Sequence, residues 1–334
     1  MTWTSGTAML VFWPSAVLSL GAAAVLVTRL ERLGARLDLP EAMLGLLVAL
    51  AADAPEISSA VTALAGGQRS IGTGVILGSN AFNLAALLGL AALTAGQISL
   101  HRRVVLLDGG VATWLAAVCI ALVTGLIGGI LALILAVVVV APYVVISSIH
   151  PRRRDRLPLP GRARRWLAGA VSDEEVELIE ALRAPKAGLA DAVAGVLALA
   201  VVVGASAAME RAGAQIGARY AVPGIVTGGL LLAAVTSLPN VVSAIYLARR
   251  GRAAATLSGA LNSNTLNVLA GLLIPAAIVG SPAPSAGAIV TAGWYGGLTL
   301  CAIGLAWAGR GLGRRAGLVI IVLYLILVPV LFAF

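Results

Sequence analysis

The chain has 334 residues, of which 60% are hydrophobic and 11% are charged, and its formal net charge is +9. A soluble protein of this length needs more polar side chains to cover its surface, so the composition excludes the soluble classes. The apolar residues lie in long blocks, several of them longer than the roughly 20 residues with which a helix crosses a bilayer. Strand alternation is absent, which argues against a membrane barrel. We therefore predict an all-α integral membrane protein.

Ten apolar blocks follow one another along the chain, separated by charged or Gly/Pro-rich breaks. The predicted spans cover residues 9–29, 41–66, 72–96, 104–125, 127–148, 188–209, 222–248, 253–279, 285–308 and 316–334. The hydrophilic stretch 149–187 contains Ser172 three residues before Glu175, a capping-box pattern that predicts the start of a short amphipathic helix. The predicted organisation is a five-helix half over 1–148, a basic linker over 149–187 and a second five-helix half over 188–334.

The distribution of basic residues predicts the orientation. If 149–187 is cytoplasmic and the sides alternate, the inside loops collect 20 of the 23 lysines and arginines, and only Arg69, Arg211 and Arg219 fall outside. This asymmetry obeys the positive-inside rule. We expect a multi-pass protein of the plasma (inner) membrane with a cytoplasmic central loop and both termini outside. The same asymmetry explains the net charge without a nucleic-acid partner.

Two segments of the chain repeat at a constant offset. Pro55 matches Pro239, and the hexapeptide at 78–83 (Gly-Ser-Asn-Ala-Phe-Asn) matches that at 262–267 (Asn-Ser-Asn-Thr-Leu-Asn). Shared hydrophobicity does not readily produce matches of Pro, Ser and paired Asn. Five predicted spans separate the copies, so the second copy points the opposite way through the membrane. We predict ten transmembrane helices arranged as two inverted five-helix repeats, a layout typical of transporters with a site near the bilayer midplane.

Proline and acidic residues lie together in the middle of the second span. Pro55 and its counterpart Pro239 each remove a backbone donor, which predicts a helix break, although a simple kink is the alternative. Asp53 and Glu56 lie at the first of these breaks, where a buried carboxylate is costly and marks a site for a cation or a proton. A structural salt bridge is the other interpretation, but no basic residue lies deep in any predicted span. Asp108, near the cytoplasmic end of span four, is left out of the site.

Neutral side chains that carry oxygen complete the repeat segments. They are Ser79, Asn80, Asn83, Thr236, Ser237, Asn240, Ser263, Asn264 and Asn267. Hard cations such as Ca²⁺ take six to eight oxygen ligands at about 2.3–2.6 Å. Cys and His are missing from the cluster, which disfavours zinc and copper. For the Ser and Thr residues alone, hydrogen bonding between helices is an equally good interpretation.

These motifs resemble those of the calcium/cation antiporter superfamily, which includes the sodium/calcium exchangers. Each of its two repeats pairs a Gly-Thr-Ser-x-Pro-Glu-like segment with Gly-Ser-Asn-x-Phe-Asn, and residues 78–83 fit the second segment in full. The resemblance implies an antiporter that exchanges Ca²⁺, or a similar cation, against Na⁺ or H⁺ by alternating access. The ion ligands that it implies are Glu56, Ser79, Asn83, Thr236, Ser237, Asn240, Ser263 and Asn267.

The chain departs from this family pattern at the ion site. Asn240 replaces the usual glutamate of the second repeat, and Ala52 replaces the motif threonine. Asp53 occupies a usual serine position, and we add it to the ligands because it restores the lost charge from the opposite repeat. Asp53 and Glu56 together then balance one Ca²⁺, while their mutual repulsion favours a proton on one of them.

Several functional alternatives stay open. Exchange of another mono- or divalent cation is one, and a non-transporting scaffold or sensor that retains the fold is another. An enzyme is not expected, because no nucleophile–base pair or His-rich cluster is found. We predict the transported ions and the lipid bilayer as partners, with no further cofactor.

Overall fold

A computed structural model describes residues 4–150, 160–179, 188–249 and 255–333, and the chain is mostly helical. The elements of the first half are α1 (Ser5–Arg36), α2 (Glu41–Ala52), α3 (Ala54–Ala65), α4 (Arg69–Asn83), η1 (Leu84–Leu90), α5 (Ala91–Ala95), α6 (Arg102–Val123) and α7 (Gly129–Ser148). The linker contains α8 (Gly161–Ile179). The second half has α9 (Leu189–Arg219), α10 (Gly224–Val226), η3 (Thr227–Leu232), α11 (Ala233–Thr236), α12 (Leu238–Arg249), α13 (Ala255–Leu266), η4 (Asn267–Leu273), α14 (Ile274–Val279), α15 (Ala286–Ala308) and α16 (Arg314–Leu331). The η elements are π-helical turns.

Eight of the described helices are long and apolar enough to cross a membrane, and the bent pair α2–α3 brings the number to nine. A shorter apolar helix covers Gly224–Thr236 and leads into α12. The outer faces of the long helices carry bare apolar side chains, such as Leu10 (75% exposed) on α1 and Val196 (69%) on α9. Exposing such surfaces to water is unfavourable in proportion to their area, so these faces suit lipid.

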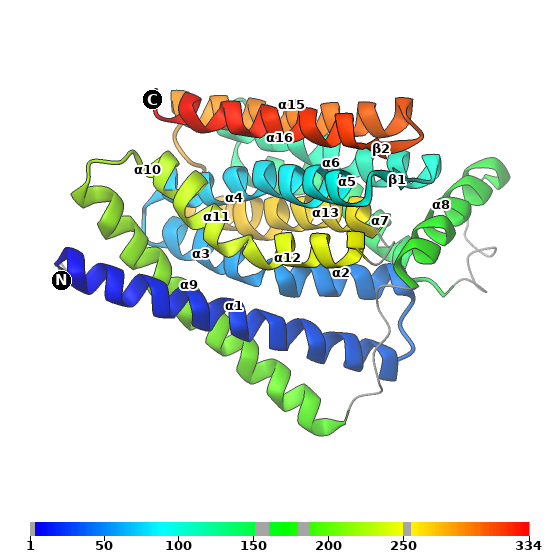
Figure 1. Ribbon diagram of the computed structural model, residues 1–334, viewed down its shortest axis with the longest axis horizontal. Coiled ribbons are helices and arrows are strands. Elements are labelled where there is room, and N and C mark those ends of the chain that lie inside the picture. Colours follow the sequence, from blue (N-terminus) through cyan, green and yellow to red (C-terminus); the bar gives the residue numbers. More distant parts are fainter. Residues whose placement is uncertain (1–3, 151–159, 180–187, 250–254, 334) are drawn as a thin grey trace.

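The helices lie in one bundle with α1 and α9 along one edge and α15 and α16 along the opposite edge (Figure 1). The broken helices α2–α3 and α11–α12, together with α4 and α13, occupy the space between these edges. The linker helix α8 lies at one end of the bundle, near the start of α2 (Figure 1). This order places the segments that carry the repeat motifs at the centre.

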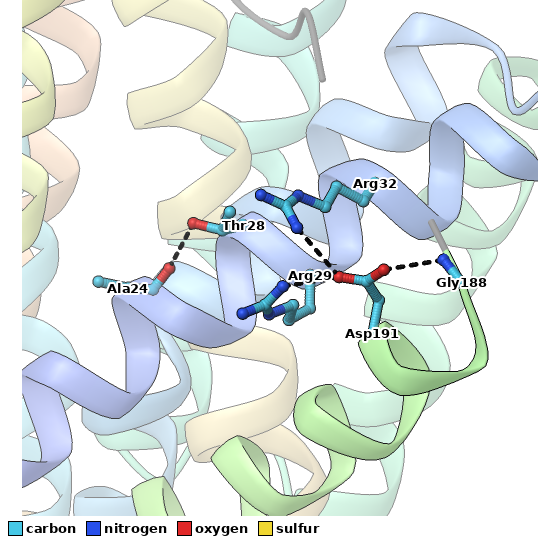
Figure 2. A network of polar contacts seen from close by, with 6 residues as sticks. All are labelled: Ala24, Thr28, Arg29, Arg32, Gly188 and Asp191. Atoms are coloured by element: carbon cyan, nitrogen blue, oxygen red, sulfur yellow. Dashed lines mark hydrogen bonds and ion pairs between the residues drawn. The ribbon is translucent and has the colours of Figure 1, made fainter. Parts of the chain in front are cut away.

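Polar contacts join α1 and α9, the first helices of the two halves. Ser19 and Ser206 share a buried hydrogen bond of 2.7 Å. At the start of α9, one carboxylate oxygen of Asp191 accepts hydrogen bonds from Arg29 (2.7 Å) and Arg32 (3.2 Å), as Figure 2 shows. Its other oxygen accepts from the Gly188 N–H at 2.8 Å and so caps the helix. The favourable charge at a helix N-terminus and the two arginines fix this end of α9 against α1.

Each repeat contains a helix that is interrupted near its middle. α2 and α3 meet at an angle of 53° with Asp53 at the junction, and Ser237 separates α11 from α12. The breaks lie two residues before the prolines and not at them as predicted: Pro55 and Pro239 are each the second residue of the following helix. A proline is tolerated in the first turn, where its missing N–H would have no helical acceptor. The prolines therefore begin the second half-helices, and the polar residues just before them occupy the breaks.

Glycines allow α4 to pack directly against α10 and η3. A Cβ atom on Gly78 would collide with the backbone of Gly229, and one on Gly74 would lie 2.7 Å from the Ile225 carbonyl oxygen. Small residues at such crossings let helix backbones approach closely, which is how helices associate in membranes. This contact joins α4, which carries the motif at 78–83 of the first half, to the interrupted helix of the second half.

Three details of the sequence prediction are wrong. The linker helix α8 begins at Gly161, so Ser172 lies inside it and not at its N-terminus, because the helix extends upstream through Ala and Arg residues of high helix propensity. α9 continues ten residues beyond the predicted end of span six at residue 209. The chain is also not purely helical: β1 (Gln97–Ser99) and β2 (Gly311–Gly313) pair antiparallel and so satisfy the backbone groups of two neighbouring loops.

We predict that Gly78→Ala lowers the free energy of unfolding by about 1–3 kcal/mol, since the added methyl group separates two backbones. Gly259→Ala on α13 is the matched control, because nothing lies within 4 Å of its Cβ position. Denaturant unfolding in detergent measures both variants. Equal stability of the two would contradict the close α4–η3 contact.

Candidate cation site

The two acids of the first repeat are completely buried at the break between α2 and α3. Asp53 and Glu56 each have 0% exposed surface. Asp53 is the junction residue itself, and Glu56 lies in the first turn of α3, where the helix N-terminus favours a negative charge. In the part of the chain that the structure describes, neither acid forms an ion pair with a basic side chain.

Each acid accepts a hydrogen bond from the interrupted helix of the other half. Ser237 Oγ donates to Glu56 Oε1 at 2.9 Å, and Asn240 Nδ2 donates to Asp53 Oδ1 at 3.2 Å. In the repeat alignment Asp53 corresponds to Ser237 and Glu56 to Asn240, so the two bonds are related by the repeat. The first repeat supplies the acceptors and the second supplies the donors. Both acids therefore contact the same segment of the second half, at Ser237 and Asn240.

Four asparagines on α4 and at the α13–η4 junction form a reciprocal network beside the acids. The Nδ2 atoms of Asn80 and Asn264 donate to each other's backbone carbonyl oxygens, at 3.1 and 3.0 Å. Asn83 Nδ2 donates to Asn264 Oδ1 at 3.3 Å, and Asn267 Nδ2 donates to Asn80 Oδ1 at 3.2 Å. In the repeat alignment Asn80 corresponds to Asn264 and Asn83 to Asn267, so each of these bonds has an equivalent bond in which the two halves exchange roles. Such reciprocal contacts are typical of a two-fold relation. The two repeat motifs face each other across this network.

Asn83 connects the asparagine network to the acids. Its Oδ1 accepts from Asn240 Nδ2 at 3.2 Å, and its Nδ2 donates to Ser263 Oγ at 3.2 Å. The hydroxyls of Ser79 and Thr236 are buried as well but donate to carbonyls of their own helices, at Ile76 and Leu232. Hydrogen bonds thus connect Asp53, Asn83, Asn240, Ser263 and Asn267, through Asn80 and Asn264, in one network, and Glu56 and Ser237 form a pair of their own. Ser79 and Thr236 stay bonded within their own helices.

Several oxygens of this network retain unused acceptor capacity. Asp53 Oδ2, Glu56 Oε2 and Asn267 Oδ1 are buried and have no hydrogen-bond partner. A buried polar atom without a partner costs about 1–3 kcal/mol, which a bound cation or proton would offset. No group of three or more His, Cys, Asp or Glu residues within the described ranges is placed to hold a metal ion. A cation here would therefore take two carboxylates and complete its shell with amide, hydroxyl and carbonyl oxygens, the donor set that hard cations prefer.

The backbone is also irregular at this place. The π-helical turns η1 and η4 begin at Leu84 and Asn267, at the ends of the two asparagine motifs. Such turns often occur at functional sites because they widen the helix and leave carbonyls less tightly engaged. Their starts agree with the repeat to within one residue, because Leu84 corresponds to Val268.

Comparison with known proteins gives the family. The sequence pattern of the sodium/calcium exchanger protein family matches residues 7–149 and 190–333. The chain belongs to this family. The two matched segments contain both repeat motifs of this exchanger-family chain and leave out most of the linker. No curated protein matches it closely enough to count as a relative.

Solved structures share the fold of this exchanger-family chain. The H⁺/Ca²⁺ exchanger CAX matches with a TM-score of 0.72 at 16% identity, over 98% of this chain and 85% of that one. The sodium-calcium exchanger NCX_Mj matches with a TM-score of 0.61 at 16% identity, over 98% of this chain and 100% of that one. YfkE matches with a TM-score of 0.62 at 17% identity, over 99% and 96%. At these identities the likeness concerns the fold.

Asn80 and Asn264 were predicted as members of the oxygen-rich set and not as ion ligands. In the structure their side chains hold the two motifs together. Their identity in the two repeats was the signal. Glu210, a buried acid on α9, was missed because the predicted span ended one residue before it. Asp108 is buried too and accepts a hydrogen bond from the Tyr143 hydroxyl.

We predict that the Asn80→Ala and Asn267→Ala substitutions are not additive. A double-mutant cycle on unfolding in detergent should give a coupling energy of about 0.5–3 kcal/mol, because each side chain bonds directly to the other. The same cycle with Ser19→Ala and Asn267→Ala should be additive, since Ser19 bonds to Ser206 instead. Additivity in both cycles would contradict the network.

Proposed function

We propose that this chain is a secondary antiporter that exchanges Ca²⁺, or a similar cation, against Na⁺ or H⁺. The observation that carries the proposal is the pair of fully buried acids, each bonded to a neutral donor of the opposite half and each with a second oxygen that has no partner. Two carboxylates in an apolar bundle need positive charge, and no basic side chain in the described ranges pairs with them. A mobile cation meets this need and leaves the pair free to release it.

The proposed layout is ten membrane spans in two inverted five-helix halves, 1–148 and 188–334, joined by the linker 149–187. The tenth span requires α10 to α12 to cross the membrane as one interrupted helix. The inverted relation is supported by the reciprocal asparagine bonds, which place equivalent atoms of the two motifs opposite each other. With the linker cytoplasmic, the basic loops face the inside of the plasma (inner) membrane and both termini lie outside.

In the proposed mechanism the cation binds to Asp53 and Glu56 from either side in turn. Asn83, Asn240, Ser237, Ser263 and Asn267 supply further oxygens from both halves, and Ser79 and Thr236 contribute through oxygen lone pairs that their own hydrogen bonds leave open. Ligands from both halves couple occupancy to the relative position of the halves, because a shift of one half changes the ligand distances. The coupling ion competes for the same carboxylates, so the two ions exchange rather than move together.

Asn240 sets the charge of the site in this proposal. Its amide donates to both Asp53 and Asn83, a role that a carboxylate cannot fill. The amide therefore holds the site at two acids and stabilises them when the cation leaves. Exchange of a different mono- or divalent cation is the second candidate, and it is favoured by this same substitution of an amide for an acid.

We predict that Glu56→Gln or Asp53→Asn lowers Na⁺- or pH-gradient-driven uptake of radioactive Ca²⁺ into everted vesicles by about tenfold or more, because loss of one ligand charge costs at least the ~1.4 kcal/mol of a tenfold change. Asp38→Asn is the control: this acid is exposed in the loop before α2, and Asn tolerates its positive φ of 53°. Unchanged uptake in Glu56→Gln would reject the site. If vesicles without the transporter take up every cation as fast as vesicles that contain it, antiport itself is rejected.

We further predict that Asn240→Asp strengthens binding of divalent over monovalent cations. The third carboxylate lies against Asp53 and repels it, and Ca²⁺ relieves more of that repulsion than Na⁺ does. Cation-dependent thermal stabilisation of the purified protein measures the change, since a ligand bound only by the folded state raises its stability. Competition among Ca²⁺, Mn²⁺, Mg²⁺ and Na⁺ identifies the preferred ion. An unaltered order of preference would show that position 240 does not face the ion.

A further inference from the structure

Two arginines near the end of α1 share a single acid at the start of α9. Arg29 Nη1 and Arg32 Nη1 donate to the same oxygen, Asp191 Oδ1, at 2.7 and 3.2 Å (Figure 2). The other oxygen of Asp191 accepts from the Gly188 N–H at 2.8 Å. The two guanidinium groups therefore lie side by side, and both oxygens of their acid are engaged.

The arginine pair carries more charge and more donors than Asp191 can match. A guanidinium stays charged and presents several N–H donors in a planar fork. Within the described residues, the Nε atoms of Arg29 and Arg32 have no hydrogen-bond partner, and Asp191 is the one acid that pairs with these arginines. Glu31 lies between them in the sequence, but residues one or two apart do not share a helix face. One positive charge is thus left over at this contact.

The arginines lie at the border of a surface that suits lipid. The side chains of Arg29 and Arg32 are 31% and 33% exposed. A Cβ atom on Gly195 would lie 3.6 Å from Arg29 Cβ, so the stem of this arginine packs on α9. Next to Gly195, the apolar side chains of Val193 and Val196 are exposed on the same helix. A charged group and an exposed apolar strip therefore adjoin each other where α1 crosses α9.

A phospholipid combines the two chemistries that this place offers to a ligand. Its phosphate can accept charge-assisted hydrogen bonds from two adjacent guanidinium groups. Its acyl chains can cover apolar side chains that would otherwise meet water. A free anion would suit the arginines but would leave the apolar strip bare. The surplus positive charge favours a headgroup with a net negative charge over a zwitterionic one.

We propose that Arg29 and Arg32, held in place by Asp191, bind the phosphate of one anionic phospholipid whose chains lie along Val193 and Val196. In the proposed orientation this lipid belongs to the inner leaflet, where anionic lipids attract basic side chains. Because α1 belongs to the first half and α9 to the second, the bound lipid joins the two halves at a place distant from the Asp53 break. Only the choice of leaflet rests on the proposed orientation, and the binding itself does not depend on antiport.

Lipid binding to the purified full-length chain tests the proposal without any transport measurement. Native mass spectrometry counts the lipids that bind when delipidated protein in detergent is titrated with phosphatidylglycerol or with phosphatidylcholine. We expect one phosphatidylglycerol to bind more tightly than phosphatidylcholine. Arg29→Gln and Arg32→Gln should each weaken this binding about fivefold, the effect expected for one arginine at a lipid surface. Inorganic phosphate at the same concentration as the lipid should not displace it.

Arg219→Gln is the matched control, because Arg219 lies in the last turn of α9, at the other end from Asp191. Asp191→Asn is a second variant that removes the carboxylate competing with the phosphate and keeps both arginines. It should bind phosphatidylglycerol at least as tightly as the unaltered protein does.

Three results would overturn the lipid site. The first is equal binding of the two lipids, and the second is an equal loss of binding in Arg219→Gln and in the Arg29 and Arg32 variants. The third is weaker binding in Asp191→Asn, because it would trace the effect of the arginines to a loosened contact between α1 and α9. Displacement of the lipid by inorganic phosphate would instead assign the arginines to a free anion and reject the lipid.

Discussion

The structure depends on keeping two carboxylates inside an apolar helical bundle. Removing a carboxylate from water is costly unless other groups solvate it, and in the hydrocarbon layer no water is available for this. Here the second half of the chain supplies a hydroxyl from Ser237 and an amide from Asn240, one for each acid. Neither half could hold the site alone, because the first contributes the charge and the second contributes the donors.

This division of roles explains why the halves pack as they do. The acids lie at a helix break, and the break is held by close contacts around it rather than by its own backbone bonds. The glycines of α4 let its motif reach η3, and the asparagines of α4 and α13 lock the two motifs face to face. The outermost helices α1 and α9 are tied to each other by Asp191 and its arginines, at a distance along the chain from the site.

The repeat is close to symmetric in its backbone and asymmetric in its chemistry. The asparagines and the π-helical turns after them occur in both halves, whereas acids stand against neutral donors at the breaks. The symmetric backbones of the two halves surround one site, and the difference between acids and neutral donors at the breaks sets the charge of that site. Positions 78 and 262, which are equivalent in the repeat, differ in the same way. Gly78 allows close packing of backbones, whereas Asn262 accepts a hydrogen bond from Tyr143.

The amino-acid sequence was enough to predict the membrane setting, the repeat and most of the residues at the centre, because these follow from apolar length, constant spacing and the cost of buried charge. It also indicated that Asp53 would meet the groups around Asn240. The folded arrangement was needed to show that the break falls at Asp53 rather than at Pro55, that Ser79 and Thr236 bond back to their own helices, and that Asp108 is buried against Tyr143. These features depend on which side chains come into contact from helices that are distant in the chain, and the local sequence pattern does not predict such contacts.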